Sequence, residues 1–179
     1  MECRITTVST DELDELADVA AQTFPLACPP AVSADNVAAF IDANLSAVRF
    51  ADYSADPERE VLVARAAEGT PILGYAMLIR GVPDDPDVLR AVTVRPAVEL
   101  SKIYVLPDSH GGAVAAGLMA AALAYAERQG AACLWLGVNQ ENVRAQRFYA
   151  KQGFTVNGTK SFTLGDHIEN DYVMVRPIS

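Results

Sequence analysis

The chain has 179 residues, of which 51% are hydrophobic and 21% are charged. This length suits one globular domain with a substantial core, so we expect a single domain over residues 1–179. The 14 basic and 23 acidic side chains give a formal net charge of −9, which argues against a nucleic acid held on a basic surface.

The first part of the chain predicts a short strand followed by two helices. Residues 5–8 form the strand, and the segment Ser9-Thr-Asp-Glu12 matches a capping box at a helix start. Apolar residues at helical spacing then predict a helix that ends near Pro25, and Ser33 is the predicted N-cap of the second helix. The polar, proline-containing stretch over residues 51–60 predicts a loop.

The rest of the chain predicts strands joined first by turns and then by helices. Residues 60–66 and 71–80 form a strand pair, and a proline-punctuated connection after it carries a short strand over residues 91–94. The later elements are a strand over 100–106, a helix over 114–128, a strand over 133–138, a helix over 141–152, and strands over 154–164 and 168–176. This order predicts a mixed α/β fold, with an antiparallel sheet early and a βαβ crossover late.

Cysteine spacing and hydropathy argue against several classes of protein. Cys3, Cys28 and Cys133 are widely separated, so neither a zinc site nor a disulfide framework is predicted. The N-terminal sequence does not resemble a signal peptide, and the longest apolar stretch, residues 113–126, is shorter than the ~20 residues of a membrane span. Residues 166–169 contain metal-binding residue types, but they lie at a predicted hairpin tip. We therefore expect a cytoplasmic protein without a metal or a membrane partner.

The most informative segment is a glycine loop after the strand over residues 100–106. It reads His110-Gly111-Gly112-Ala113-Val114-Ala115 and leads into an Ala/Leu-rich helix. Such a loop presents free backbone N–H groups at the positive end of a helix, which suits a phosphate. By itself such a glycine pair is more often an ordinary turn. A second segment downstream, residues 142–154, strengthens the phosphate interpretation.

Together the two segments resemble the general N-acetyltransferase (GNAT) superfamily, and the resemblance covers nearly the whole chain. The acyl-CoA loop of that superfamily aligns with residues 110–115, where His110 and Ala113 depart from the commonest pattern. The second motif is matched by Asn142, Ala145, Phe148-Tyr149 and Gly153-Phe154. The resemblance implies a mixed, mostly antiparallel sheet of about six or seven strands, four helices and splayed central strands. Residues 162–174 are similar to the branch that includes polyamine acetyltransferases.

The resemblance implies acetyl-CoA as cosubstrate. Its pyrophosphate would lie on the amides at the start of the helix, and its amide-rich arm would pair with a strand edge at residues 103–105. Asn142 would bind the arm from the other side. The expected cofactor-binding residues are Ile103, Tyr104, Val105, His110, Gly111, Gly112, Ala113, Val114, Ala115, Asn142, Ala145, Phe148 and Tyr149.

Acetyl transfer to an amine needs a base, a donor for the oxyanion and a partner for the leaving thiolate. The Val105 amide is the expected oxyanion donor, and Tyr149 is expected to protonate the thiolate or hydrogen-bond to it. Glu99 is the candidate base, because it precedes Ile103 by four residues and strand alternation would place both side chains on one face. The alternatives are a core role for Tyr149, and for Glu99 a solvated or ion-paired role with water as the base.

We therefore predict an acetyl-CoA-dependent N-acetyltransferase that works by direct attack in a ternary complex, since no cysteine falls in either motif. The acceptor is expected to be a small primary amine, and the acidic composition and the C-terminal likeness favour a cationic one. As acceptors, polyamines, amino acids, antibiotics and protein N-termini all stay open. Transfer of an acyl chain longer than acetyl also stays open. The alternative is a non-catalytic acyl-CoA-binding sensor or structural subunit, which Ala113 motivates. A homodimer is expected by analogy with such folds.

Overall fold

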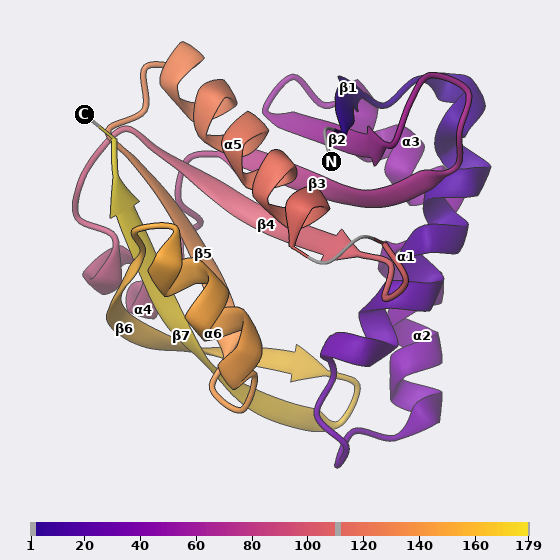
Figure 1. The fold of residues 1–179 in the computed structure, drawn as a ribbon. Helices are drawn as coiled ribbons and strands as arrows, with labels where there is room; N and C mark the ends of the chain where they lie inside the picture. The colour runs from indigo at the N-terminus through magenta and orange to yellow at the C-terminus, as the bar shows by residue number, and fades with distance from the viewer. Residues whose placement is uncertain (1–2, 110–111, 179) are drawn as a thin grey trace.

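A seven-stranded sheet is the centre of the computed structural model, which describes residues 3–109 and 112–178 (Figure 1). Its strands are Arg4–Thr7 (β1), Arg59–Arg65 (β2), Ile72–Arg80 (β3), Ala97–Val105 (β4), Cys133–Asn139 (β5), Thr155–Leu164 (β6) and His167–Pro177 (β7). The strand order is β1-β2-β3-β4-β5-β7-β6, and every neighbouring pair is antiparallel except β4–β5. The predicted mixed, mostly antiparallel sheet is confirmed.

Six α-helices are present in the described part of the chain, not the four that were expected. They are Leu13–Ala27 (α1), Ala34–Asn44 (α2), Ala47–Ala55 (α3), Pro86–Ala91 (α4), Ala113–Arg128 (α5) and Val143–Lys151 (α6). The helices α5 and α6 lie on one side of the sheet, and α4 lies behind β6 (Figure 1). No helix among the described residues has the length and apolar character that crossing a bilayer requires.

Of the two additional helices, α3 overlaps the predicted loop, and α4 lies in the proline-punctuated connection and meets the predicted strand only at Ala91. Residues 51–60 were expected to form a loop, but α3 continues to Ala55, because the Ser46 side chain caps its start and Phe50 is fully buried. Residues 91–94 were expected to form a strand. Instead the Asp85 side chain caps α4 and Pro86 occupies its first turn, a position that suits proline.

Among the described residues, three hydrophobic clusters pack on the sheet, and the two larger ones lie on its opposite faces. One contains Leu118 and Met119 of α5 packed on β3, β4 and β5, and α6 adds only partly buried side chains to it. The other contains Leu16 and Phe24 of α1 together with Phe50 of α3, packed on the opposite face of β2 and β3. Burying each such side chain contributes about 2 kcal/mol, so the two cores fix β2 and β3 from both faces.

The central strands β4 and β5 separate part-way along their length. They pair only at Ala97↔Cys133, Val98↔Leu134 and Glu99↔Trp135, although β4 continues to Val105 and β5 to Asn139. The separation of the two strands is visible in Figure 1. The expectation of splayed central strands is confirmed, and the facing backbone edges beyond Glu99 are left unpaired with each other.

Candidate active site

A cavity of about 670 Å³ lies where β4 and β5 separate. The predicted site residues on its wall are Glu99, Ile103, Tyr104, Val105, Gly112, Ala115, Asn142, Ala145, Phe148 and Tyr149. Val114 of α5 is buried in the core, and neither it nor Ala113 lines the cavity. His110 and Gly111 lie outside the described residues. The cavity therefore brings together both motifs and the candidate base.

The N-terminus of α5 supplies unpaired backbone donors at one end of the cavity. The first helical hydrogen bond runs from the Ala116 N–H to the Gly112 carbonyl, at 2.9 Å. The N–H groups of residues 113–115 therefore have no partner within the helix. Among the described residues no side chain caps this end, and a Cβ built on Gly112 would meet none of their atoms within 4 Å. Open donors at the positive end of a 16-residue helix suit a phosphate.

The free edge of β4 continues this row of donors. The Leu106 N–H donates to the Leu73 carbonyl at 2.8 Å and so points toward β3. Because backbone groups alternate along a strand, the N–H groups of Val105 and Ile103 point the other way, into the gap that β5 leaves. We call the α5 start, this β4 edge and the facing side of α6 the backbone groove. It can pair with an amide-rich ligand.

On the α6 side of the groove, Asn142 and Tyr149 have different roles. The Asn142 side chain caps α6 by accepting a hydrogen bond from the Ala145 N–H at 3.1 Å. Tyr149 is half-buried and packs edge-on against Phe148 and Phe154. Burial raises the pKa of the Tyr149 phenol well above its usual value. The phenol therefore keeps its proton at neutral pH and can act as a hydrogen-bond donor.

A β-bulge in β4 decides which way Glu99 points. Met77 pairs with Lys102, whereas Leu78 pairs with Leu100, so Ser101 is an extra residue. An extra residue reverses the alternation of side chains along the strand. The expectation that Glu99 shares a face with Ile103 is therefore wrong.

The packing on either side of the bulge agrees with this reversal. Val98 and Leu100, which flank Glu99, lie in the core beneath α5, and Ile103 packs against that same core. Tyr104 instead packs against the core of the α1 side. Glu99 consequently shares a face with Lys102 and Tyr104, toward α1 and α2.

Burial perturbs the two ionisable groups that flank the bulge. Desolvation raises the pKa of Glu99, although the positive charges of Lys160, Lys102 and Arg59 partly oppose it. Desolvation also lowers the pKa of Lys102 to about 8, against the opposing effect of Glu99. Both side chains are half-buried on the cavity wall. A carboxylate with a raised pKa is a better proton acceptor than an ordinary one.

The far end of the cavity is walled by aromatic rings from separate elements. Phe24 of α1 stacks on Phe40 of α2 with ring centroids 4.5 Å apart, and Phe40 meets Phe162 of β6 at 5.6 Å. Tyr104 of β4 also lines this part, and burial raises the pKa of its phenol to about 12. We call the part bounded by these four rings, Glu99, Lys102 and the polar side chains of β6 and β7 the aromatic chamber.

Polar side chains of β6 and β7 complete the aromatic chamber. Lys160 Nζ lies 3.4 Å from Asp171 Oδ2, and the two residues are directly opposite in the register. Glu169 Oε2 accepts a hydrogen bond from Asn139 Nδ2 at 3.1 Å, and Glu169 Oε1 lies 2.5 Å from His167 Nε2. These contacts are missing from the sequence prediction. A signal for them existed, because a two-residue hairpin turn at Gly165-Asp166 places residue 160 opposite residue 171.

The comparison with known proteins agrees with this geometry. The sequence profile described as "Acetyltransferase (GNAT) family" matches residues 16–154. The chain belongs to the GNAT acetyltransferase family. It is 59% identical over 167 residues to an uncharacterized N-acetyltransferase of Mycobacterium tuberculosis and to one of Mycobacterium bovis, covering 93% of this chain and 98% of each relative.

Solved structures share the fold of this acetyltransferase. The PaiA N-acetyltransferase from Thermoplasma acidophilum, in complex with coenzyme A, aligns with a TM-score of 0.77 and 19% identity over 99% of this chain and 100% of that one. The ribosomal-protein-S18-alanine N-acetyltransferase from Escherichia coli aligns with a TM-score of 0.67 and 20% identity, over 99% and 95% of the two chains. This chain is thus an N-acetyltransferase whose family implies acetyl-CoA as the acyl donor.

The backbone groove of the acetyltransferase fits the chemistry of acetyl-CoA. The free N–H groups at the start of α5 would hold the pyrophosphate, and the unpaired β4 edge would hold the amides of the pantetheine arm. The arm would run past Val105 toward Tyr149 and the aromatic chamber. The donors on this path belong to the main chain, so the departures at His110 and Ala113 leave their chemical character unchanged.

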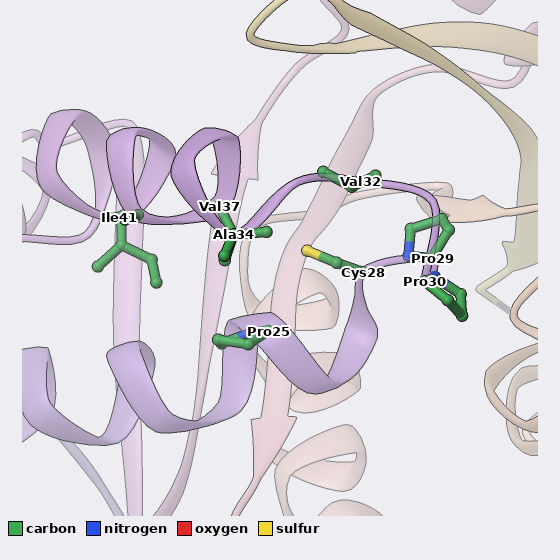
Figure 2. Close-up of a pocket in the computed structure, with 9 residues that line it drawn as sticks. Pro25, Cys28, Pro29, Pro30, Val32, Ala34, Val37 and Ile41 are labelled. Carbon is green, nitrogen blue, oxygen red and sulfur yellow. The ribbon is translucent and has the colours of Figure 1, made fainter.

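A smaller hollow of about 450 Å³ lies between the end of α1 and α2, and Figure 2 shows its apolar lining. Cys28 and Pro29 line both this hollow and the main cavity. Burial raises the pKa of the Cys28 thiol, and its Sγ lies 3.4 Å from the Phe24 carbonyl oxygen. A protonated, hydrogen-bonded thiol is a poor nucleophile, so Cys28 is unsuited to carry an acetyl group.

Proposed function

We propose that this acetyltransferase transfers acetyl from acetyl-CoA to the primary amine of a small acceptor that arrives as an ammonium ion. The observation that carries the proposal is the continuity of the cavity. The backbone groove supplies neutral donors for the acyl carrier, and the aromatic chamber supplies carboxylates for a cation. The two meet beside Val105, where β4 and β5 have parted. We also propose that residues 1–179 act as one domain, because a single sheet joins β1 to β7.

The proposed reaction proceeds by direct attack. Glu99 takes a proton from the ammonium, and the free amine attacks the thioester carbonyl, forming a C–N bond. The Val105 N–H, which points into the gap, stabilises the oxyanion of the tetrahedral intermediate. The C–S bond then breaks: Tyr149 gives its proton to the departing thiolate and takes up the proton that the nitrogen of the intermediate loses, so that the phenol is restored. The protonated state of Cys28 favours this ternary-complex route over an acetyl-cysteine intermediate.

The bulge at Ser101 gives this scheme a structural basis. Without it, Glu99 would face the α5 core, away from an incoming acceptor. With it, the carboxylate faces the aromatic chamber, while Val105 still directs its N–H into the gap. The same strand therefore presents the base to one substrate and the oxyanion donor to the other.

A binding measurement followed by a turnover measurement tests the proposal. Acetyl-CoA and free CoA should each raise the melting temperature, because ligands that bind only the folded state stabilise it. Release of the CoA thiol from acetyl-CoA, measured over a panel of primary amines, should then identify acceptors. Strong stabilisation without turnover of any amine would support a non-catalytic acyl-CoA sensor. Absence of stabilisation by either compound would contradict both functions.

A further inference from the structure

Most charged side chains of the aromatic chamber already have partners. Lys160 pairs with Asp171, and Glu169 is engaged by Asn139 and His167. Among the described residues, two half-buried ions on this wall form neither a hydrogen bond nor an ion pair, with each other or with any other group. They are Glu99 and Lys102. Their opposite charges are therefore available to a ligand.

The bulge places these two ions side by side. Because Ser101 is the extra residue, Glu99 and Lys102 behave as next neighbours on one face of β4, with Cα atoms about 7 Å apart. Both line the same cavity as Phe24, Phe40 and Phe162. The wall thus combines one anion, one cation and a continuous apolar surface.

An unpaired, partly desolvated charge is costly to maintain, and sites that bind charged ligands are where such charges occur. Lys102 stays mostly protonated at pH 7, because its pKa is lowered only to about 8. A polyamine would bring a second cation toward this ammonium, which is unfavourable. An acceptor with one ammonium and one carboxylate would instead match both ions.

We propose that Lys102 binds a carboxylate of the acceptor, so that the acceptors are amino acids with apolar side chains. This inference rests on the proposed function, since it takes the aromatic chamber as the acceptor site. It departs from the cationic, polyamine-like acceptor that the net charge and the C-terminal segment favour. Glu99 receives the amino group, Lys102 the carboxylate, and the rings of Phe24, Phe40 and Phe162 the side chain.

The experiment compares matched acceptors that differ only in the carboxylate. L-Phenylalanine, L-leucine and L-methionine are each tested beside the corresponding primary amide and decarboxylated amine, with spermidine as a polyamine. For the unmodified enzyme, kcat/KM should be about 10- to 100-fold higher for the amino acids than for their carboxylate-free analogues. This factor is what one charge-assisted hydrogen bond contributes.

Substitution of Lys102 should remove the preference selectively. Lys102→Met should lower kcat/KM for the amino acids by about the same factor, mainly through KM, and leave the carboxylate-free amines within about 3-fold. Lys102→Arg should retain the preference, and Lys102→Glu should shift it toward spermidine. Lys151→Met is the matched control, because Lys151 is exposed at the end of α6 outside the cavity.

The outcomes separate this inference from the proposed function. Equal or faster turnover of the carboxylate-free amines by the unmodified enzyme would overturn the assignment of Lys102 while leaving acetyl transfer intact. An equal loss for both acceptor classes in Lys102→Met would also overturn it, provided that acetyl-CoA still raises the melting temperature of the variant. No turnover of any amine would overturn both.

Discussion

The two ends of the cavity are built from different kinds of chemical group. The backbone groove uses main-chain N–H groups of α5 and β4, whose positions follow from the fold itself. The aromatic chamber uses side chains from α1, α2, β4, β6 and β7, whose identity the course of the main chain does not specify. The fold therefore determines which acyl carrier binds, whereas individual side chains determine which acceptor binds. Substitutions in the aromatic chamber should therefore change acceptor binding, whereas those in the backbone groove that keep the N–H groups should change acetyl-CoA binding little.

The largest effect is expected at Tyr149, which lies where the two ends meet. Tyr149→Phe removes only the hydroxyl, which forms no hydrogen bond to any other described residue and so leaves no partner unsatisfied. We expect kcat to fall about 100-fold, the usual contribution of a general acid, and the acetyl-CoA dissociation constant to change less than about 3-fold. Steady-state kinetics and calorimetry measure the two quantities.

Tyr125→Phe is the matched control, since Tyr125 is buried in α5 outside the cavity. An unchanged kcat in Tyr149→Phe would contradict the role of Tyr149 as general acid. A raised dissociation constant with unchanged kcat would instead make Tyr149 a binding residue of the backbone groove.

The second effect concerns the pH dependence that Glu99 would impose. Burial raises its pKa, and a base must be deprotonated to act, so kcat/KM should fall as the pH decreases through this raised value. Glu99→Gln should flatten that acidic limb and lower kcat/KM about 30-fold on the plateau. A pH–rate profile of both proteins measures this, with Glu127→Gln, an exposed residue of α5, as the control. An acidic limb that survives in Glu99→Gln would assign the proton transfer to water or to another residue.

The direction of the Glu99 side chain could not be predicted from the sequence alone. Its direction depends on the extra residue Ser101, and the segment around it contains no glycine or proline that would indicate a bulge. The bulge exists because β3 pairs with β4 in two registers on either side of it, and that pairing involves residues 18 or more positions apart. A strict alternation of side chains therefore predicts the wrong face.

Other features could be predicted because their causes are local. The glycine loop, the α5 pattern and the motif around Asn142 and Tyr149 are short-range signals that suffice for the resemblance to the family, and that resemblance in turn implied the splayed strands. The helix α4 also had a local signal, the pair Asp85-Pro86, which the strand prediction overlooked. The ring cluster of Phe24, Phe40 and Phe162 had no local signal in the sequence, because it forms only when three distant elements meet.

A single added methyl group on β5 should affect the aromatic chamber alone. A Cβ on Gly137 would lie 2.5 Å from Lys160 Cε and 3.3 Å from Asp171 Oδ2. Gly137→Ala must therefore displace the Lys160 side chain and loosen its pair with Asp171. We expect KM for the acceptor to rise about 10-fold, which is what the loss of one hydrogen bond implies. The acetyl-CoA dissociation constant should stay within about 2-fold, because the backbone groove is undisturbed. An equal change in both constants would mean that the two ends of the cavity are not independent.

A methyl group added at Gly112, in the backbone groove, should have the smallest effect of these substitutions. Gly112 has φ −83° and ψ −2°, which alanine adopts without strain, and its added Cβ would meet no atom of the described residues within 4 Å. Because the groove binds through N–H groups that alanine retains, Gly112→Ala should change the acetyl-CoA dissociation constant less than about 3-fold. The helix start should lose about 0.5 kcal/mol, since alanine is a poorer N-cap than glycine. Calorimetry with acetyl-CoA and a thermal melt measure these quantities. A rise of more than about 10-fold in the dissociation constant would show that the loop needs the conformational freedom of glycine, and the backbone groove would then be as sensitive to sequence as the aromatic chamber.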